Sequence, residues 1–238
     1  MITSKEALDP LYTTNVRCVC CETPFTTSRM RPSFKKVIRA DSDFCSYYSD
    51  DNNPDYYVVR VCPYCGFAST ENSTASLTEG QKSNYLANLG LNWEPREYGG
   101  KRTLSQAMEC YKIALLCAQS IEEKPRIIAG LLQHIAWLYR YMGDEQQERR
   151  FLRFALDAYI RVYEVDVNSI NNAKLMYLIG ELHRRLQDYN DAVKWFSRVI
   201  HNKKIIDGAM IHRSREQWQI LREEMLANKM ELPEAMQQ

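Results

Sequence analysis

The sequence of 238 residues lacks a long hydrophobic run and lacks an apolar segment near its start. A helix that crosses a membrane needs about 20 consecutive apolar residues, and no stretch of the chain approaches that length. The first residues, MITSKEALDPLY, carry charges and a proline where an export signal has its apolar core. We therefore expect a cytoplasmic protein that does not bind membranes.

The sequence also lacks an excess of either charge, which disfavours nucleic acid as a partner. Lys and Arg together number 31, Asp and Glu together number 30, and the formal net charge is +1. Proteins that neutralise many phosphates carry a basic excess, at least on one face. One local basic stretch does interleave with two phenylalanines that suit base stacking, but several aspartates follow it closely and largely cancel its field. The stretch comprises Arg17, Arg29, Arg31, Lys35, Lys36 and Arg39, with Phe25 and Phe34.

Groups typical of catalysis are scarce. The 4 histidines all lie in predicted helices, and His183 occupies a helix-packing position, which favours a packing role over that of a general base. The string Gly99-Gly100-Lys101-Arg102-Thr103 lacks the spacing of a phosphate-binding loop. Asp41 and Asp43 alternate on a strand-like segment, with Arg39 on the same face. A salt-bridged cluster is favoured there over a hydrolytic pair or a second cation site, because structural ion pairs also form such clusters. An enzyme is therefore the less favoured hypothesis.

Cysteine, in contrast, is abundant, and 4 of the 8 thiols form two pairs with a spacing of three positions. In a reducing compartment such pairs favour metal or redox chemistry over disulfides. A tight turn aims both sulfurs of a pair at one point, and two such turns complete a tetrahedral site of four sulfurs, which suits Zn²⁺. We predict that Cys18, Cys21, Cys62 and Cys65 hold one structural zinc ion.

Other chemistry at these cysteines is less favoured. A thioredoxin-like site needs a cysteine pair that opens a helix in a βαβ unit, and neither pair lies in one. An iron centre uses the same ligands and stays open as an alternative. Cys20 should point away from the metal and Cys45 could lie near it; either could substitute as a fourth ligand, but the symmetric pairs fit better. Cys110 and Cys117 lie seven apart on a predicted helix and are interpreted as small buried hydrophobes.

The local patterns separate a β-rich start from a helical remainder. Residues 1–75 have the composition of a small β domain, with strands expected at 36–39 and 56–61. A short helix between Gly80 and Trp93 should pack through Tyr85, Leu86, Leu89 and Trp93. From Thr103 the apolar period is helical, and Thr103 with Gln106 resembles a capping box. The helices are expected from Leu104 to Ala118, from Pro125 to Met142, and over 145–164, 170–187, 190–201 and 207–228.

The helical part contains a repeat that resembles the tetratricopeptide pattern. In the clearer copy, small residues at Gly180 and Ala192 allow two helices to approach closely. A second copy around Ala136 starts 44 positions earlier rather than about 34, so the copies are irregular. Stacked pairs curve, and their first helices line a concave face. The residues placed there are rich in aromatic and Arg side chains, as binding hot spots are: Gln133, Trp137, Arg140, Tyr141, Lys174, Tyr177, Glu181 and Arg184.

Several strings of the chain are similar to one known family. They are Arg39-Ala40-Asp41-Ser42-Asp43-Phe44-Cys45, Pro54 with Tyr56-Tyr57, and Cys62-Pro63-Tyr64-Cys65-Gly66-Phe67-Ala68, joined to the Cys18 and Cys21 pair and to Arg102-Thr103-Leu104. Together they resemble a bacterial family catalogued as domain of unknown function 2225, over most of residues 15 to 200. The resemblance implies a zinc-ribbon-like start followed by tetratricopeptide-like helices, and it implies no activity.

The predicted fold class is therefore α+β, a small N-terminal zinc-ribbon-like β domain followed by an all-α tetratricopeptide-like helical array. We expect the zinc-ribbon-like domain at 1–75, a connector at 76–101, the helical domain at 102–228 and a tail at 229–238. The favoured function is a non-enzymatic scaffold that binds another protein or a peptide through its concave helical face. The alternatives are a metal-dependent or redox enzyme that uses the Cys- and Asp-rich N-terminal domain, and nucleic-acid binding through the zinc-ribbon end.

Overall fold

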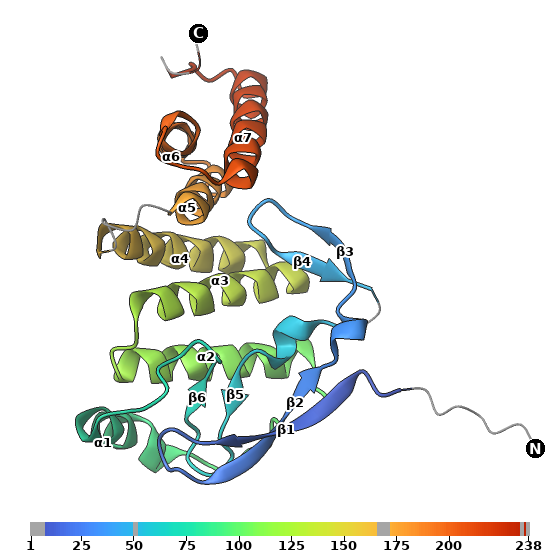
Figure 1. Ribbon diagram of the computed structural model, residues 1–238, viewed down its shortest axis with the longest axis vertical. Helices are drawn as coiled ribbons and strands as arrows, with labels where there is room; N and C mark the ends of the chain where they lie inside the picture. Colours follow the sequence, from blue (N-terminus) through green and yellow to red (C-terminus); the bar gives the residue numbers. More distant parts are fainter. Residues whose placement is uncertain (1–7, 50–51, 166–171, 234–235, 237–238) are drawn as a thin grey trace, which may run out of the picture. The chain divides into compact units, whose positions relative to one another are not determined.

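The computed structural model confirms the α+β fold class. It describes residues 8–49, 52–165, 172–233 and 236. Within these residues, three two-stranded antiparallel sheets and seven α-helices are present, with the strands in the N-terminal part (Figure 1). No helix in the described part of the chain is long and apolar enough to cross a membrane.

The chain divides into two compact units, which are described separately. The first unit contains residues 1–40 and 46–138, and the second contains residues 41–45 and 139–238. The short segment Asp41–Cys45 thus belongs to the second unit, although its neighbours in sequence belong to the first. The domain ranges expected from composition stay a prediction, and residues 234–235 and 237–238 of the expected tail lie outside the described residues.

Three hairpins form the β part of the first unit. The strands are β1 (Leu11–Arg17) with β2 (Pro24–Met30), β3 (Val37–Ala40) with β4 (Ser46–Tyr48), and β5 (Arg60–Val61) with β6 (Ala68–Ser69). Strand β3 matches the expected strand at 36–39 to within one residue. The β1–β2 hairpin was not predicted, because the segment LYTTNVR is mostly polar and its side chains are largely exposed.

The prediction of a strand at 56–61 was wrong for most of its length, because only the last two residues form a strand. Residues Pro54–Tyr57 form a 3₁₀ turn instead. The Asn53 side chain accepts a hydrogen bond of 2.9 Å from the Asp55 backbone N–H, and Pro54 supplies a fixed φ at the first position. These two local features start a helical turn and outweigh the β preference of the tyrosines and valines that follow.

Three helices belong wholly or partly to the first unit: α1 (Glu79–Asn88), α2 (Leu104–Ser120) and the first residues of α3 (Pro125–Met142). Thr103 and Gln106 form the predicted capping box, in which each side chain bonds the backbone N–H of the other. Pro125 begins α3, where its missing N–H costs no hydrogen bond. Helix α2 contacts β5 and β6, the two strands that flank the second cysteine pair, and crosses them rather than running parallel to them (Figure 1).

A buried arginine ties the loops of the first unit together. Arg102 is 4% exposed, and its guanidinium donates to the backbone carbonyl oxygens of Tyr56, Val59 and Tyr98 at 2.7–2.8 Å. Five donors in a rigid fork suit an arginine to this role, and a lysine does not supply them. The segment 99–103, which lacks the spacing of a phosphate-binding loop, therefore contributes the arginine that holds these loops together.

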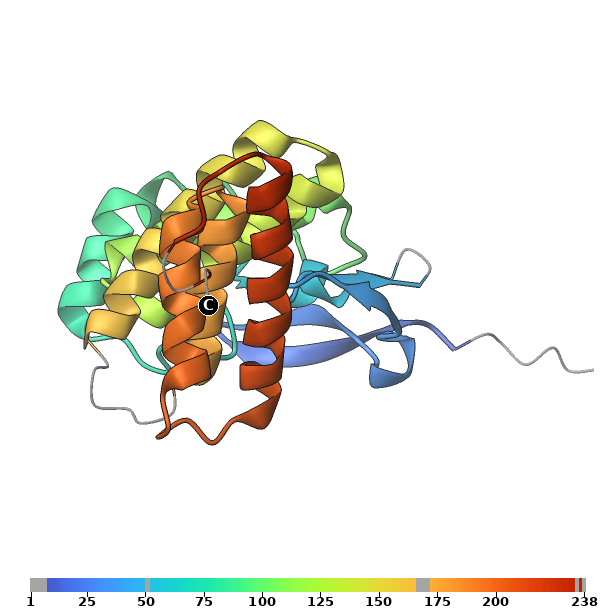
Figure 2. The same cartoon turned by 90° about the horizontal axis from the view of Figure 1, so that it is seen from above.

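The second unit is helical, with α4 (Glu145–Val165), α5 (Ala173–Arg185), α6 (Tyr189–His201) and α7 (Gly208–Ala227). These bounds lie within three residues of the predicted ones, and residues 170 and 171 of the expected α5 range lie outside the described residues. Helices α5, α6 and α7 pack side by side (Figure 2). A Cβ at Gly180 would lie 2.9 Å from Phe196 Cε1, so α5 and α6 do approach closely at this small residue.

Candidate metal centre

The first cysteine pair lies in the loop of the β1–β2 hairpin. Arg17 pairs with Pro24, and the six residues between them form the loop. The Cys18 N–H donates to the Thr23 carbonyl at 3.1 Å, and the Glu22 N–H donates to the Cys18 carbonyl at 3.0 Å. Glu22 takes a φ of +61° to close the loop. We call this loop, Cys18–Thr23, the first knuckle.

The second cysteine pair lies in a loop of the same design between β5 and β6. The Cys62 N–H donates to the Phe67 carbonyl at 3.0 Å, and the Gly66 N–H donates to the Cys62 carbonyl at 2.9 Å. Gly66 takes a φ of +74°, as Glu22 does at the equivalent position of the first knuckle. The loop Cys62–Phe67 is called the second knuckle. Each knuckle therefore presents two sulfurs from one tight turn.

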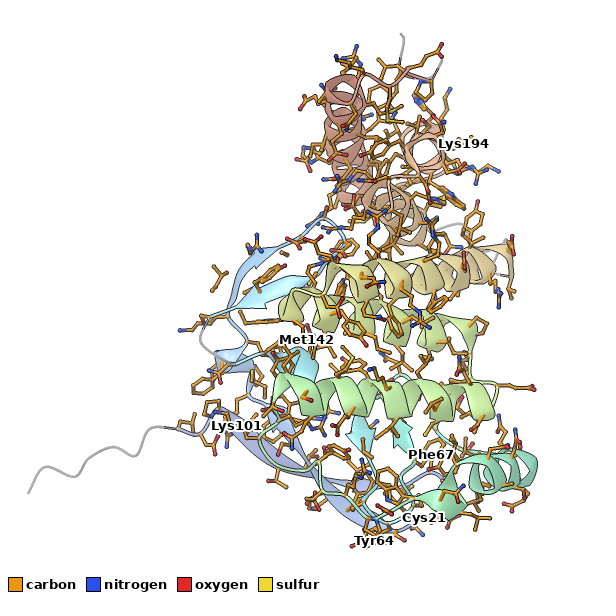
Figure 3. All side chains as sticks on the ribbon, turned by 180° about the vertical axis from the view of Figure 1, so that it is seen from behind. Cys21, Tyr64, Phe67, Lys101, Met142 and Lys194 are labelled. Carbon is orange, nitrogen blue, oxygen red and sulfur yellow. The ribbon has the colours of Figure 1, made fainter. Side chains whose placement is uncertain are left out.

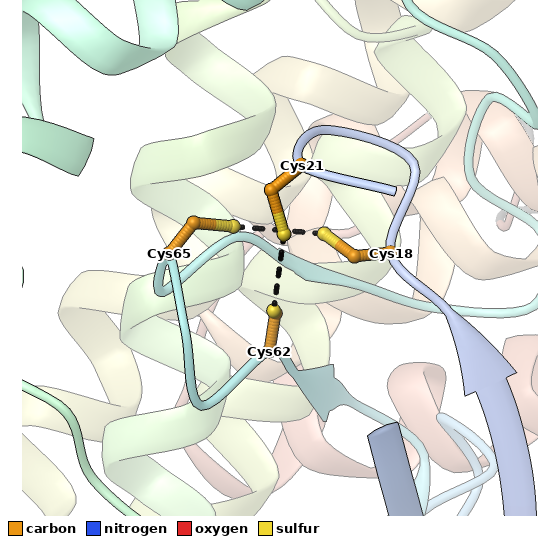
Figure 4. Close-up of side chains that lie close together, drawn as sticks. All are labelled: Cys18, Cys21, Cys62 and Cys65. Atoms are coloured by element: carbon orange, nitrogen blue, oxygen red, sulfur yellow. Dashed lines mark hydrogen bonds between the residues drawn. The ribbon is translucent and has the colours of Figure 1, made fainter. Parts of the chain in front are cut away.

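The four sulfurs converge on one point (Figure 4). Cys18 Sγ lies 3.6 Å from Cys65 Sγ, and Cys21 Sγ lies 3.7 Å from Cys62 Sγ. All four sulfurs lie within 4.8 Å of one another. Ligands at the corners of a tetrahedron stand about 3.8 Å apart when the metal–sulfur bonds are about 2.3 Å long. The four cysteines form no disulfide, and their spacing fits a single tetrahedral ion.

The thiols perturb one another's ionisation. A hydrogen bond from the Cys65 thiol lowers the pKa of Cys18 to about 5, and the same interaction raises the pKa of Cys65. Burial raises the pKa of Cys62 to about 11. Four thiolates at these distances repel one another, so all can ionise together only around a cation. The donor set therefore fits a metal ion that prefers thiolate.

Aromatic side chains cover the second knuckle. The Tyr85 hydroxyl donates to the Cys65 carbonyl at 2.6 Å, and its ring packs edge-on against Phe67 at 4.9 Å. Trp93 Nε1 donates to the Pro63 carbonyl at 3.0 Å. Cys18, Cys62 and Cys65 are buried, whereas Cys21 lies at the outer edge of the unit (Figure 3). Two of the packing residues expected in the connector, Tyr85 and Trp93, thus protect the centre.

The other cysteines stand outside the group of four. Cys20 is buried within the first knuckle, and burial raises the pKa of its thiol to about 11. Cys45 belongs to the second unit, where its sulfur lies 3.5 Å from the Tyr141 hydroxyl. Cys110 and Cys117 are buried on α2, as expected. Cys117 Sγ also accepts a hydrogen bond of 3.3 Å from the Ala68 N–H, so it supports the strand that follows the second knuckle.

The residues predicted to bind a partner are largely engaged within the chain. Gln133 and Trp137 are buried in the first unit. The remaining six lie in the second unit, and each contacts the segment Asp41–Cys45: Arg140, Tyr141, Lys174, Tyr177, Glu181 and Arg184. Sequence reasoning selected this set for its arginines and aromatic residues, but it gave no sign that part of the same chain binds there.

Asp41 and Asp43 do not share a strand face with Arg39, which corrects the sequence interpretation. Strand β3 ends at Ala40, and the two aspartates lie in the turn that follows. Arg39 instead stacks on the Tyr47 ring, with its guanidinium carbon 3.8 Å from the ring centroid. The aspartates form ion pairs with Arg140 and Arg185 of the second unit. The cluster is therefore an ion-pair network, as the sequence suggested, but with these arginines in place of Arg39.

Two further candidate groups have structural partners. His183 is buried, burial lowers its pKa, and its Nδ1 lies 3.5 Å from an Asp188 carboxylate oxygen. In the local basic stretch, Arg17 pairs with Glu22 and Arg29 pairs with Glu71. These contacts occupy groups that a general base or a phosphate-binding surface would use.

The family of the chain follows from a match to one family model. Residues 11–221 match the model described as "Uncharacterized protein conserved in bacteria (DUF2225)". The chain belongs to this bacterial family. No curated protein and no solved structure matches the chain. Membership in the DUF2225 family agrees with the resemblance seen in the sequence, and the cluster of four cysteines fits its zinc-ribbon-like start.

Proposed function

We propose that this DUF2225 protein is a non-enzymatic protein-interaction scaffold with one structural Zn²⁺ ion. The convergence of four cysteine sulfurs carries the proposal. Catalytic zinc sites keep one position for water or substrate, whereas four cysteine ligands fill a tetrahedral ion completely. Cys18, Cys21, Cys62 and Cys65 would hold the ion, and it would join the two knuckles without taking part in a reaction.

Zinc is proposed over iron because the site has the features of a structural staple. The first unit builds its sheets from hairpins whose strands are two to seven residues long, and such hairpins are marginally stable alone. A metal that joins two hairpin loops supplies folding free energy directly. Zn²⁺ does this without redox chemistry, and reduced thiols are expected in the cytoplasm, where we place the protein.

The scaffold part of the proposal draws on the second unit. Helices α5 and α6 pack around Gly180 and Ala192, the small residues that the tetratricopeptide-like pattern needs at this crossing. Arrays of such pairs bind peptides on the face formed by their first helices. Helix α5 is the first helix of its pair, and four of the residues proposed for partner binding lie on it.

Elemental analysis of the full chain, purified without added metal, tests the zinc assignment. We expect one zinc ion per chain, lost together with thermal stability in Cys18→Ser and Cys62→Ser. Cys20→Ser is the matched control, because Cys20 is a buried residue of the first knuckle that does not belong to the cluster of four cysteines; this variant should keep its zinc. Iron with visible absorbance, or a metal-free protein with a disulfide between the knuckles, would refute the assignment and favour redox chemistry.

The interaction role is tested with the same zinc-loaded chain. Affinity capture from a bacterial lysate should retain a protein in stoichiometric amount, and the complex should withstand treatment with nuclease. A complex that disappears with nuclease would point to nucleic acid instead. Capture of no protein at concentrations of the chain up to about 100 μM, where weak complexes form, would contradict the scaffold role.

A further inference from the structure

The segment Asp41–Cys45 is held by the second unit as a bound peptide would be. It forms a tight turn, in which the Phe44 N–H donates to the Asp41 carbonyl at 2.9 Å and the Asp41 N–H donates to the Cys45 carbonyl at 2.8 Å. Phe44 takes a φ of +71°, which a residue other than glycine rarely adopts. We call this segment the acidic turn. Two backbone hydrogen bonds thus close the turn, and one of its residues has a strained backbone conformation.

Arg140 recognises both carboxylates of the acidic turn. Its Nη1 and Nη2 bind the two oxygens of Asp43 at 3.0 and 2.7 Å, and Nη1 also binds Asp41 at 2.8 Å. Asp43 is 0% exposed. A bidentate pair between a guanidinium and a carboxylate adds geometric selectivity to its strength. Glu148 orients the guanidinium by accepting from Nε at 2.7 Å.

Side chains of helix α5 form hydrogen bonds with the backbone of the turn and with its serine. The Tyr177 hydroxyl donates to the Ser42 carbonyl at 2.8 Å. The Ser42 hydroxyl donates to Glu181 at 2.5 Å. Glu181 is 0% exposed and is itself fixed by Arg184 and Arg185, at 2.9 Å each. The serine position is therefore recognised by a buried group with its own support, as the aspartates are.

The phenylalanine of the turn lies between an aromatic ring and two cations. Its ring centroid lies 5.5 Å from that of Tyr177. Lys174 Nζ lies 4.9 Å from the Phe44 centroid, and the guanidinium carbon of Arg213 lies 5.4 Å from it. Cations at these distances are attracted to the ring. Lys174 and Arg213 are both exposed, so this end of the surface is open to solvent.

We propose that this surface is a recognition site for turns of the type Asp-x-Asp-aromatic, and that its partner is a protein that presents such a turn. The surface comprises Arg140, Lys174, Tyr177, Glu181, Arg184 and Arg213, and the acidic turn of the chain itself is its resident occupant. The inference rests on the scaffold role proposed above and names the chemistry of its partner. Charge complementarity carries it, because arginines and a lysine surround two carboxylates and an aromatic ring.

The resident turn competes with any partner for the same surface and so lowers the partner's apparent affinity. A tethered ligand acts at an effective concentration in the millimolar range, so an external turn must compete with it. The strained φ of Phe44 weakens the resident complex, and a partner turn that holds its aromatic residue in a relaxed backbone lacks that handicap. The site is therefore self-blocked and opens to a partner of higher affinity.

A fluorescent peptide with the sequence of residues 39–46, with serine in place of Cys45, tests the proposal on the full chain. The resident turn is disabled by Asp41→Asn with Asp43→Asn, which removes both carboxylates that Arg140 binds. Fluorescence anisotropy should show binding to this variant that is at least about tenfold tighter than to the wild type, whose own turn competes. Adding Lys174→Ala and Arg213→Ala, which remove exposed side chains, should weaken peptide binding by about fivefold or more without unfolding.

Peptide controls and a second readout complete the test. A peptide with both aspartates replaced by asparagine should not bind, and the intact peptide should raise the melting temperature of the disabled variant only. Equal binding to wild type and variant, or binding that ignores the aspartates, would overturn the proposal. Wild-type dimers that Asp43→Asn abolishes would also overturn it and assign the turn to a second copy. Zinc content measured on the same samples separates these outcomes from failure of the scaffold's metal site.

Discussion

Adding one methyl group to the second knuckle, as Gly66→Ala, tests the geometry of the metal centre directly. Gly66 has a φ of +74°, and a Cβ there would lie 2.3 Å from Trp93 Cδ2. A residue with a side chain costs about 1–2 kcal/mol at such a φ. The overlap also pushes the indole off the Pro63 carbonyl, and the lost hydrogen bond costs about 1 kcal/mol. We expect Gly66→Ala to lower the free energy of unfolding by about 2–3 kcal/mol.

Urea denaturation of the zinc-loaded chain, followed by far-UV circular dichroism, measures this loss. Gly100→Ala is the matched control, because no heavy atom lies within 4 Å of the Cβ it would add; its effect should stay within about 0.5 kcal/mol. Transfer of zinc to a chromogenic chelator should also become faster in Gly66→Ala. Equal midpoints for the two variants would show that the knuckle does not need glycine at this position and would refute the reasoning.

The first knuckle provides the opposite change in the same experiment. Glu22 holds a φ of +61° at the position equivalent to Gly66, so Glu22→Gly relieves about 1 kcal/mol of backbone strain. The side chain that is lost pairs with Arg17 and Lys82 at 3.5 and 3.3 Å, and exposed pairs contribute little. A higher urea midpoint for Glu22→Gly, together with a lower one for Gly66→Ala, would establish that both loops need the left-handed conformation.

Three other substitutions give independent tests. Arg102→Met removes the donor from three backbone carbonyls. The free energy of unfolding in urea should therefore fall by at least about 3 kcal/mol. Gly180→Ala places a Cβ 2.9 Å from Phe196, and we expect a net loss of about 1–2 kcal/mol in the same assay, because overpacking exceeds the gain in helix propensity. Burial of Glu123 opposes ionisation, but hydrogen bonds from Thr74 hold the pKa of this carboxyl below its usual value. A depressed pKa stabilises the fold above the unfolded-state pKa and stops doing so as the pH falls through the folded-state pKa. Thr74→Val should therefore destabilise more at pH 7 than at pH 3, as melting temperatures would show.

The helices could be predicted closely because their signals are local. A capping box starts α2, a proline starts α3, and a clear apolar period runs through α4, α5 and α6 of the second unit. Each of these features acts within one or two turns of the backbone. The spacing within each cysteine pair is equally local, so the sequence indicates where both knuckles lie. Convergence of the four sulfurs depends on contacts between residues far apart in the sequence. It could be predicted only because a tetrahedral zinc ion needs four ligands and each pair supplies two.

The β part could be predicted less well, for a physical reason that differs between its segments. The β1–β2 hairpin buries little of β1, so its strands lack the alternating apolar pattern by which strands are recognised. The segment Tyr56–Val61 has strong β propensity, yet Asn53 and Pro54 begin a 3₁₀ turn that takes its first residues. Propensity is a weak guide when a side chain offers the backbone a competing hydrogen bond.

The surface around the acidic turn could be predicted from the sequence, but the turn that lies on it could not. Arginines and aromatic residues at helical spacing predict that Arg140, Tyr177 and Arg184 form a contact surface. The turn lies about a hundred positions away from Arg140, and its alternating aspartates imitate a strand with one charged face. Pairing of opposite charges over such a separation leaves no periodic trace. The composition of the surface is therefore consistent with the segment that lies on it, an acidic turn with an aromatic residue, but it does not indicate which part of the sequence supplies that segment.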